Sequence, residues 1–540
     1  MSELFNTYLI HNIRLPLDEN EEYAFEIVRK KLNKLGISTR GLSFSLYRKS
    51  VDARKRSDVH FVVSVAFSGI GFKISPDLCA KENIGILKNE TIAPIFGDQK
   101  LTERPLIVGT GPAGLFCALL LSEYGYRPIV IEKGGNITER KAAVRRFNTE
   151  HILDASCNIQ FGAGGAGTFS DGKLVTRIND PLTSYILARF VEFGAPDEIL
   201  RLAKPHVGTD ILSALVDRMI DRIVSLGAEI HYHTEFLSFE CIGKKVVSVK
   251  TSKGIFRTDA LILATGHSCR TTYKELARSG VILQPKPCSV GMRIEHLAED
   301  IDKSMYGEFA SHPKLAHAEY NLSTNTKNRG VYTFCMCPGG EVVAATSEEG
   351  HVVVNGMSHH ARNGKNSNSA VVCSVFTEDY GNTVEGALEF IDEIERRAFV
   401  AGGNTYATPL STVGDFLDSK TPYTLPSRIM PTYMESGFYR LASPEFYLPR
   451  FVTNEIRNAL YDFNRKIDGF ASRDAILSGA ETRTSSPIRV LRDSSTKLAI
   501  GYDNLYPVGE GAGYAGGITS AAIDGARCAL EIMARYAPIL

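Results

Sequence analysis

The chain has 540 residues, of which 44% are hydrophobic and 23% charged, an ordinary globular composition. It excludes fibrous, collagen-like and wholly disordered classes of protein, and the length predicts two or three folded units. The 61 Lys and Arg residues balance the 61 Asp and Glu residues, so no net positive charge draws the whole chain to nucleic acid.

Three features of the sequence indicate the compartment. The N-terminal segment has no basic stretch followed by an apolar core, so we expect no signal peptide. Apolar runs such as Leu115–Leu121 are much shorter than the roughly 18 residues of a membrane span. The 10 cysteines are scattered, mostly in apolar segments, which favours reduced thiols over a disulfide framework. We therefore expect a cytoplasmic protein without a membrane span.

Residues 1–95 are predicted to form a small α+β domain. A strand-like run at Tyr8–Ile13 precedes a helix whose apolar residues recur every three or four positions, and Gly36 ends it. Two more strands follow at Leu42–Arg48 and His60–Phe67. The order β-α-β-β is typical of a ferredoxin-like layer.

Basic residues gather between these last two strands. The cluster consists of Arg48, Lys49, Arg54, Lys55 and Arg56. It could touch the phosphates of a ligand or of RNA, or it could be a solvated hairpin tip. Because the whole chain is neutral, we favour the hairpin tip and expect no strong binding of nucleic acid.

After a linker near residues 94–104, the pattern becomes strand, helix, strand, at Pro105–Val108, Pro112–Tyr124 and Pro128–Glu132. Three glycines in GxGxxG spacing join the first strand to the helix, and an acid follows roughly 20 residues later. These residues are Gly109, Gly111, Gly114 and Glu132. In this context the fingerprint predicts a dinucleotide site.

Each glycine of the fingerprint has its own physical reason. Gly109 permits the tight turn, Gly111 lets the backbone approach a pyrophosphate, and Gly114 lets the helix lie close to the strand. The free N–H groups at the helix start, together with the helix dipole, favour phosphate oxygens. Glu132 at the end of the second strand is expected to bind the ribose hydroxyls.

Further motifs resemble those of glutathione-reductase-type flavoproteins, which implies that the dinucleotide is FAD. Pro112 and Ala113 give the fingerprint the GxGPAG form of these enzymes, and Ala260–Gly266 (ALILATG) resembles their ATG motif. Tyr506–Gly511 (YPVGEG) resembles their C-terminal Gly-Asp motif, with Glu510 in place of the Asp. The resemblance also implies that Gly516, Gly517 and Ile518 open the last helix toward the flavin, where N–H groups stabilise charge on the reduced ring.

Longer segments resemble a family of uncharacterised bacterial FAD-dependent dehydrogenases, also described as NAD-utilising dehydrogenases. These segments are Ser50–Lys55, Asn158–Leu174, Lys286–His296, Tyr332–Gly340, Asn355–Ser358 and Tyr506–Gly525. The resemblance covers nearly the whole chain. It implies FAD and redox chemistry but no particular substrate.

The resemblance also implies cofactor contacts outside the fingerprint. A second cradle over the pyrophosphate and flavin would comprise Gly162, Gly164, Gly165, Gly167 and Thr168, with a flexible surface loop as the alternative. Arg140 would stack near or bond the adenosine half of FAD. Further contacts would come from Lys133, Thr265 and Gly266.

The domain layout follows partly from what the sequence lacks. It contains no second GxGxxG between a strand and a helix, and no CxxC or CxxxxC pair. This favours the branch of the superfamily in which one Rossmann-like FAD domain, residues 101–270 and 476–540, is interrupted by an α+β substrate domain at 271–475. A nicotinamide nucleotide, NADH or NADPH, would then bind only transiently as electron donor.

Candidates for catalysis are few. Cys335 and Cys337 would lie on one face of a strand, where the pair could cycle as a disulfide, bind a soft metal or simply pack. His359 could donate a proton or could be a surface residue. No cluster in the sequence predicts a metal site.

The leading functional hypothesis is an FAD-dependent oxidoreductase that transfers a hydride between flavin N5 and a small organic substrate. A flavin monooxygenase is the alternative within enzymes. An alternative of another class is a flavin-bearing, RNA-associated protein that docks through its basic N-terminal domain.

Overall fold

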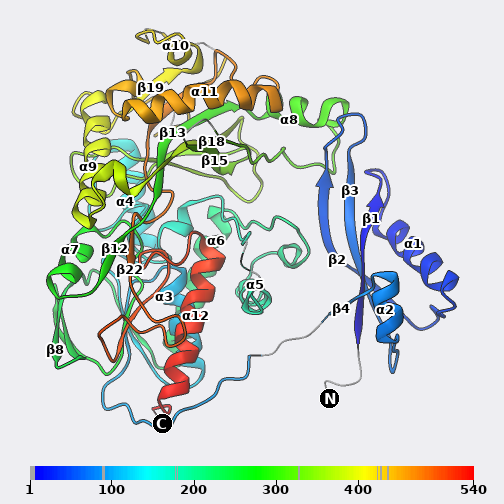
Figure 1. The fold of residues 1–540 in the computed structure, drawn as a ribbon, viewed down its shortest axis with the longest axis horizontal. Coiled ribbons are helices and arrows are strands. Elements are labelled where there is room, and N and C mark those ends of the chain that lie inside the picture. Colours follow the sequence, from blue (N-terminus) through cyan, green and yellow to red (C-terminus); the bar gives the residue numbers. More distant parts are fainter. Residues whose placement is uncertain are drawn as a thin grey trace.

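The chain forms three units, and the third interrupts the second in the sequence (Figure 1). The computed structural model describes residues 6–87, 92–176, 178, 180–325, 329–422, 424–425, 428–434 and 437–539. No helix within these ranges has both the length and the apolar character needed to cross a membrane.

The N-terminal unit is a four-stranded antiparallel sheet with two helices (Figure 1). Its elements are β1 (Thr7–Leu15), α1 (Glu21–Lys34), β2 (Ser43–Asp52), β3 (His60–Ser68), α2 (Pro76–Glu82) and β4 (Gly85–Leu87). The order β2-β3-β1-β4 of this βαββαβ chain confirms the predicted ferredoxin-like fold. The sequence interpretation ended at the third strand, and α2 and β4 complete the sheet. Ser75 caps α2 by accepting a hydrogen bond from the N–H of Leu78.

Strand β2 also joins this unit to the rest of the chain. The backbone N–H of Lys49 donates to the carbonyl of Arg201 (2.8 Å), and the Lys49 carbonyl accepts from the N–H of Ala203 (2.9 Å). At the hairpin tip, Arg54 is exposed and pairs with Asp52 at 2.5 Å. The basic cluster therefore contributes one residue to a docking edge and others to a solvated tip.

The second unit is built on a five-stranded parallel sheet of order β23-β11-β5-β6-β7. Its strands are β5 (Leu106–Val108), β6 (Ile129–Ile131), β7 (Glu229–His231), β11 (Leu261–Leu263) and β23 (Leu505–Pro507). All residues of β5, β6, β11 and β23 are buried, as expected when both faces of a parallel sheet are covered.

Helices pack on one face of this parallel sheet, and a second, antiparallel sheet packs on the other. Ile107 and Ile262 face the helices α3 (Pro112–Glu123) and α12 (Ile518–Arg535), which pack side by side (Figure 1). Leu106 faces a three-stranded antiparallel sheet on the other side. That sheet comprises β8 (Phe236–Ile242), β9 (Lys245–Thr251) and β10 (Gly254–Arg257). The remaining helices of the unit are α4 (Ile137–Glu150), α5 (Leu182–Glu192), α6 (Thr209–Ser225) and α7 (Arg270–Arg278).

The third unit, here called the insert, contains a seven-stranded sheet of order β14-β15-β18-β13-β21-β19-β20. These strands are β13 (Cys288–Leu297), β14 (Ser323–Asn325), β15 (Gly330–Cys337), β18 (Asn366–Val375), β19 (Thr408–Thr412), β20 (Tyr439–Leu441) and β21 (Ile476–Glu481). Two-stranded sheets pair β12 (Leu283–Pro285) with β22 (Ile488–Val490) and β16 (Glu341–Ala344) with β17 (Val354–Met357). Its helices are α8 (Ala298–Tyr306), α9 (Val384–Ala401), α10 (Val413–Leu417) and α11 (Arg450–Lys466).

One predicted domain boundary needs correction. The sequence predicted that the insert ends at residue 475 and that the FAD unit resumes at 476. However, β21 pairs antiparallel with both β13 and β19 of the insert. The insert therefore extends at least to Glu481, and the FAD unit resumes after it. Gly479 in β21 precedes the glycine-rich segments of the cofactor side, and only the pairing shows that this stretch is a strand inside the sheet of the insert.

Candidate active site

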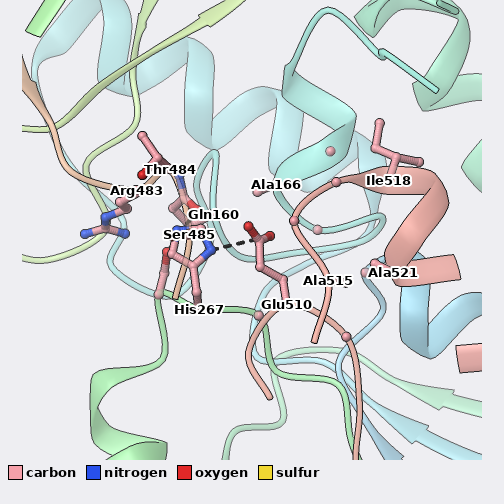
Figure 2. A pocket seen from close by; sticks show the side chains of 18 of the residues that line it. Gln160, Ala166, His267, Arg483, Thr484, Ser485, Glu510, Ala515, Ile518 and Ala521 are labelled. Carbon is pink, nitrogen blue, oxygen red and sulfur yellow. Dashed lines mark hydrogen bonds and ion pairs between the residues drawn. The ribbon is translucent and has the colours of Figure 1, made fainter. Parts of the chain in front are cut away.

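A cavity of about 1330 Å³ lies between the parallel sheet and the insert. It begins at the carboxyl ends of β5, β6 and β11, where ligands bind in open α/β sheets, and it reaches β14 and β15. Figure 2 shows Ile518 and Ala521 at the start of α12, with the segment Arg483–Ser485 on the far side of the space.

Most of the predicted cofactor residues line this cavity. They are Gly109, Gly111, Pro112, Ala113, Glu132, Lys133, Gly165, Gly167, Thr265, Gly266, Glu510, Gly517 and Ile518. The others stand behind its wall: Gly114, Arg140, Gly162, Gly164 and Thr168.

The fingerprint glycines fall into two kinds. A Cβ on Gly114 would overlap the carbonyl oxygen of Gly109, so this position fixes how closely α3 packs on the turn. A Cβ on Gly111 would meet no protein atom closer than the Cα of Gly165, at 3.9 Å, and would enter the cavity. Because α3 begins without a side-chain cap, its first N–H groups are open to an anion there.

Glu132 ties three backbone segments together at the end of β6. One carboxylate oxygen accepts from the N–H (3.0 Å) and the hydroxyl (2.7 Å) of Thr110. The other accepts from the N–H groups of Gly134 and Gly162, both at 2.9 Å. Glu132 lines the cavity although it is buried, and a bond to a ribose would add to this network.

Arg140 has a different place from the one expected. Its guanidinium is wholly buried and donates to the carbonyls of Asn158 (2.8 Å), Ile159 (2.7 Å), Gly162 (3.3 Å) and Ala163 (2.6 Å). Burial lowers the pKa of Arg140 to about 10, which leaves it charged at neutral pH. Arg140 therefore holds the glycine-rich loop in shape from behind, and it does not line the cavity in which its contact with adenosine was expected.

The glycine-rich loop itself turns only one part toward the cavity. Gly165 has a φ of 63°, and a Cβ on it would lie 2.8 Å from the Cα of Gly111, so the two loops touch through bare backbone. Gly164 and Thr168 instead face Val216 of α6, where a Cβ on Gly164 would overlap the Thr168 hydroxyl. Glycine spacing in the sequence did not distinguish Gly165, which contacts the Gly111 loop, from Gly164, which packs against α6.

Glu510 and His267 face each other across the cavity wall (Figure 2). Nδ1 of His267 lies 3.5 Å from Oε2 of Glu510, and both residues line the cavity. Nε2 of His267 is buried and has no hydrogen-bond partner in the part of the chain that the structure describes. A buried polar nitrogen normally has a partner, and a polar atom of a bound cofactor would supply it.

The start of α12 completes the cofactor side of the cavity. The helix has no side-chain cap, and a Cβ on Gly517 would meet no protein atom within 4 Å. Two uncapped helix starts, two loops that meet through bare glycines and an orphaned imidazole nitrogen thus face one space. These residues fit a flat, anionic dinucleotide such as FAD.

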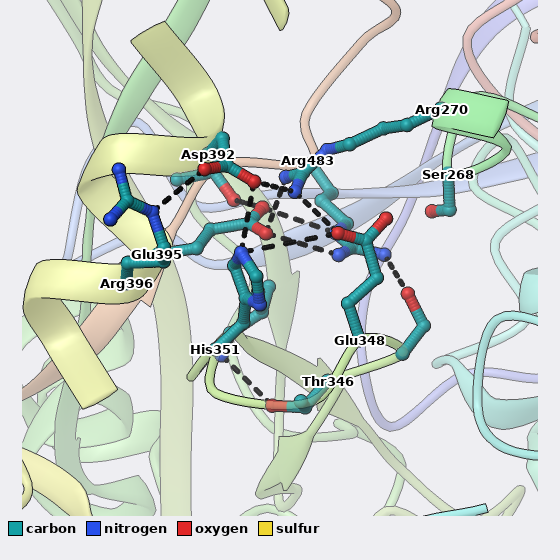
Figure 3. A network of polar contacts seen from close by, with 12 residues as sticks. Ser268, Arg270, Thr346, Glu348, His351, Asp392, Glu395, Arg396 and Arg483 are labelled. Atoms are coloured by element: carbon teal, nitrogen blue, oxygen red, sulfur yellow. Dashed lines mark hydrogen bonds and ion pairs between the residues drawn. The ribbon is translucent and has the colours of Figure 1, made fainter. Parts of the chain in front are cut away.

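A polar network that the sequence analysis missed joins the FAD unit to the insert (Figure 3). Arg270, at the start of α7, bonds Glu348 (2.7 Å), Asp392 (2.9 Å) and Glu395 (2.5 Å). Arg483 also pairs with Glu395, at 3.2 Å. Burial of Glu395 opposes its ionisation, but the two guanidinium groups lower its pKa to about 2. No local pattern in the sequence links residues so far apart.

Part of this network has the composition of a metal site. Ligand atoms of Glu348, His351 and Asp392 lie within 4.8 Å of one another. However, Arg270 already bonds both carboxylates, and Arg396 donates to Asp392 at 2.8 Å. The charges are therefore balanced within the protein.

The candidate catalytic residues separate in the structure. Cys335 is half-buried and lines the cavity, whereas Cys337 is fully buried behind it. His359 is exposed and lies outside the cavity lining, so the structure gives it no place in the site. Polar residues of the cavity wall that the sequence analysis did not single out include Lys173 and Glu319.

Comparisons with known proteins agree with the geometry of the site. Residues 287–484 match a family model described as "FAD-dependent protein, C-terminal domain-like", and residues 107–165 match "NAD(P)-binding Rossmann-like domain". Residues 8–68 match a domain of unknown function. The first match ends after β21, in agreement with the corrected boundary. An uncharacterised protein of Clostridium beijerinckii is 40% identical over 533 residues, which cover 98% of each chain.

The chain belongs to the same family as this clostridial protein. Its FAD-dependent C-terminal match and the cradle together show that the cofactor is FAD and that the protein is an FAD-dependent oxidoreductase. The solved structure of CtdE in complex with FAD is 13% identical, with 81% of this chain and 87% of that chain covered and a TM-score of 0.33. L-proline dehydrogenase from P. horikoshii is also 13% identical, with 81% and 94% covered and a TM-score of 0.33.

Proposed function

We propose that this flavoprotein transfers a hydride between flavin N5 and a small organic substrate bound against the insert. The observation that carries the proposal is the single cavity that runs from the Gly111 loop to Cys335 on β15. At about 1330 Å³ it exceeds the roughly 300–1000 Å³ of a typical ligand pocket. It therefore offers room for a second molecule beside the dinucleotide.

The chain's own residues would bind, orient and shield the reactants. Bound FAD would supply the electron chemistry. The uncapped N–H groups at Gly111 and Gly517 would hold the pyrophosphate and stabilise negative charge on the ring. His267 and Glu510 would hydrogen-bond the part of the cofactor between them, and the seven-stranded sheet would exclude water from above.

The far end of the cavity is polar, which favours a polar substrate. The ammonium of Lys173 is buried there and lies 3.4 Å from a carboxylate oxygen of Asp171. Burial alone would lower the pKa of Lys173, but the negative charge of Asp171 outweighs this and raises it. The ammonium therefore stays charged at neutral pH. Glu319 lines the same end. A substrate with both an anionic and a hydrogen-bonding group would match these residues.

Anaerobic stopped-flow of the FAD-loaded protein tests the proposal. Mixing with NADH and with NADPH, followed by loss of flavin absorbance, should show rapid reduction by one of the two. If neither nucleotide reduces the flavin, a screen of polar metabolites under the same conditions should find the direct donor. A flavin that no nucleotide and no metabolite reduces, in protein that binds FAD, would contradict hydride transfer. Oxygen incorporated into a product would indicate a monooxygenase instead.

A further inference from the structure

Strand β15 contains a bulge at the point where it meets the cavity. Phe334 pairs with Ala370 of β18 and Cys337 pairs with Asn368, so β15 has one residue more than its partner between these pairs. Cys335 lies in the bulge with a φ of 44°, a left-handed conformation that is costly for a residue with a side chain. Bulges of this kind re-aim side chains and are frequent next to active sites.

The bulge, rather than strand alternation, brings the two cysteines of β15 together. Cys335 lines the cavity and is partly exposed, whereas Cys337 lies directly behind it and is fully buried. The Cys337 thiol donates a hydrogen bond to the carbonyl oxygen of Cys335 at 3.3 Å, which holds the two cysteines next to each other. One sulfur thus meets the cavity and the second can reach the first.

The surroundings of Cys335 favour its thiolate. Its hydrogen bond with Cys337 lowers the pKa of Cys335, and the positive charges of Arg293 and Lys173 act in the same direction. Arg293 is wholly buried and donates to the Cys335 carbonyl at 3.1 Å, while Glu481 binds it from the other side. The pKa of Cys337 is raised by the same thiol pair and by burial. The lower pKa of Cys335 suits a thiolate that attacks from the cavity side, and the higher pKa of Cys337 suits a partner that stays protonated.

We propose that Cys335 and Cys337 are a redox-active dithiol that exchanges two electrons with the flavin in the same cavity. In the oxidising direction two thiols lose their protons and two electrons, and one S–S bond forms. The flavin takes up both electrons and one proton, and the second proton leaves to solvent. In reverse, the dithiol is regenerated and can reduce a substrate that enters beside Cys335. This inference rests on the proposed function of the cavity.

The chain provides a matched control pair. Burial and the neighbouring Cys117 thiol raise the pKa of Cys528, but both cysteines are fully buried, in α3 and α12, and neither lines the cavity. Serine at either position should leave the electron count of the enzyme unchanged. The comparison therefore separates a redox-active pair from two cysteines that only touch.

An anaerobic reductive titration of the FAD-loaded enzyme with dithionite tests the proposal. Full reduction should take about four electrons per FAD in the wild type, because flavin and disulfide are each two-electron couples. It should take about two in Cys335→Ser and in Cys337→Ser, and about four in Cys117→Ser. Alkylation and peptide mass spectrometry of the oxidised wild type should show a Cys335–Cys337 disulfide, a readout that is independent of turnover.

The outcomes separate the two proposals. An end point of two electrons per FAD in the wild type, with both cysteines alkylated in the oxidised protein, would overturn the dithiol pair and leave the flavin function intact. A wild type that binds no FAD would overturn the proposed function and the electron exchange together. Loss of two electron equivalents in Cys117→Ser would also contradict the assignment to β15.

Discussion

At the scale of single residues, two fingerprint glycines should respond differently to the same methyl group. In Gly111→Ala the Cβ enters the cavity without a clash, so we expect FAD affinity to fall about tenfold or more. Its free energy of unfolding should change by less than about 1 kcal/mol. In Gly114→Ala the Cβ overlaps the Gly109 carbonyl oxygen, so the free energy of unfolding should fall by about 1–3 kcal/mol. FAD titration and urea unfolding measure both effects, and equal loss of stability in the two variants would contradict the distinction.

Arg140 allows a second test at this scale. Arg140→Met removes the donor to four carbonyls, of which that of Gly162 keeps the N–H of Gly165 and three lose their partner, so we expect it to destabilise the protein by about 3–5 kcal/mol. Arg145→Met, at an exposed position of the same helix, should change stability by no more than about 0.5 kcal/mol. Urea unfolding of both variants and of the wild type measures these differences in the free energy of unfolding. Similar stabilities of the two variants would show that Arg140 does not hold the loop.

The same residues show what motifs can and cannot predict. Spacing pointed to Gly111 and Glu132, and a motif resemblance pointed to Glu510; all three line the cavity, because strand and helix geometry fixes where such residues stand. The resemblance did not reveal that Arg140 lies behind the loop, since a position in the sequence does not say on which side of a loop a long side chain lies. The partly buried His267 could be placed next to the ATG motif, but its contact with Glu510 needed the fold.

At the scale of elements, Asp524 on α12 holds the turn that carries Glu510. Its carboxylate accepts from the N–H of Gly509 (2.7 Å) and pairs with Arg492. Asp524→Ala should lower FAD affinity about tenfold with little change in helical circular dichroism, because the turn loses its anchor while α12 keeps its packing. Glu531→Ala, two turns further along, is the control. Unchanged FAD affinity in Asp524→Ala would contradict this role for the helix.

Elements were predicted well where local signals are strong. The first β-α-β-β elements, the fingerprint helix and α12 follow from periodicity, capping and glycine stops. The bulge in β15 has no such signal: strict alternation predicted both cysteines on one face, and only the register against β18 reveals the extra residue. The order of the seven-stranded sheet was likewise beyond prediction, because its neighbours β13 and β21 are far apart in the chain.

At the scale of the whole molecule, the Arg270–Glu395–Arg483 network couples the FAD unit to the insert. The pKa of Glu395 falls from 4.5 to about 2 on folding, so its stabilisation is present in full above pH 4.5 and is lost as the pH falls toward 2. The amount is on the order of 3 kcal/mol. Glu395→Gln should therefore be less stable than the wild type at pH 7, and the difference should shrink on acidification. Urea unfolding at several pH values measures it, and a difference that does not change with pH would contradict the account.

The central claim is that one cavity, built from both larger units, holds FAD. Its most direct test is an equilibrium titration of FAD into flavin-free protein, followed by flavin fluorescence, for the wild type and Gly111→Ala. The account predicts saturation at about one FAD per chain in the wild type and much weaker binding in the variant, which should remain folded. No saturable binding by the wild type, or equal binding by both proteins, would contradict the claim.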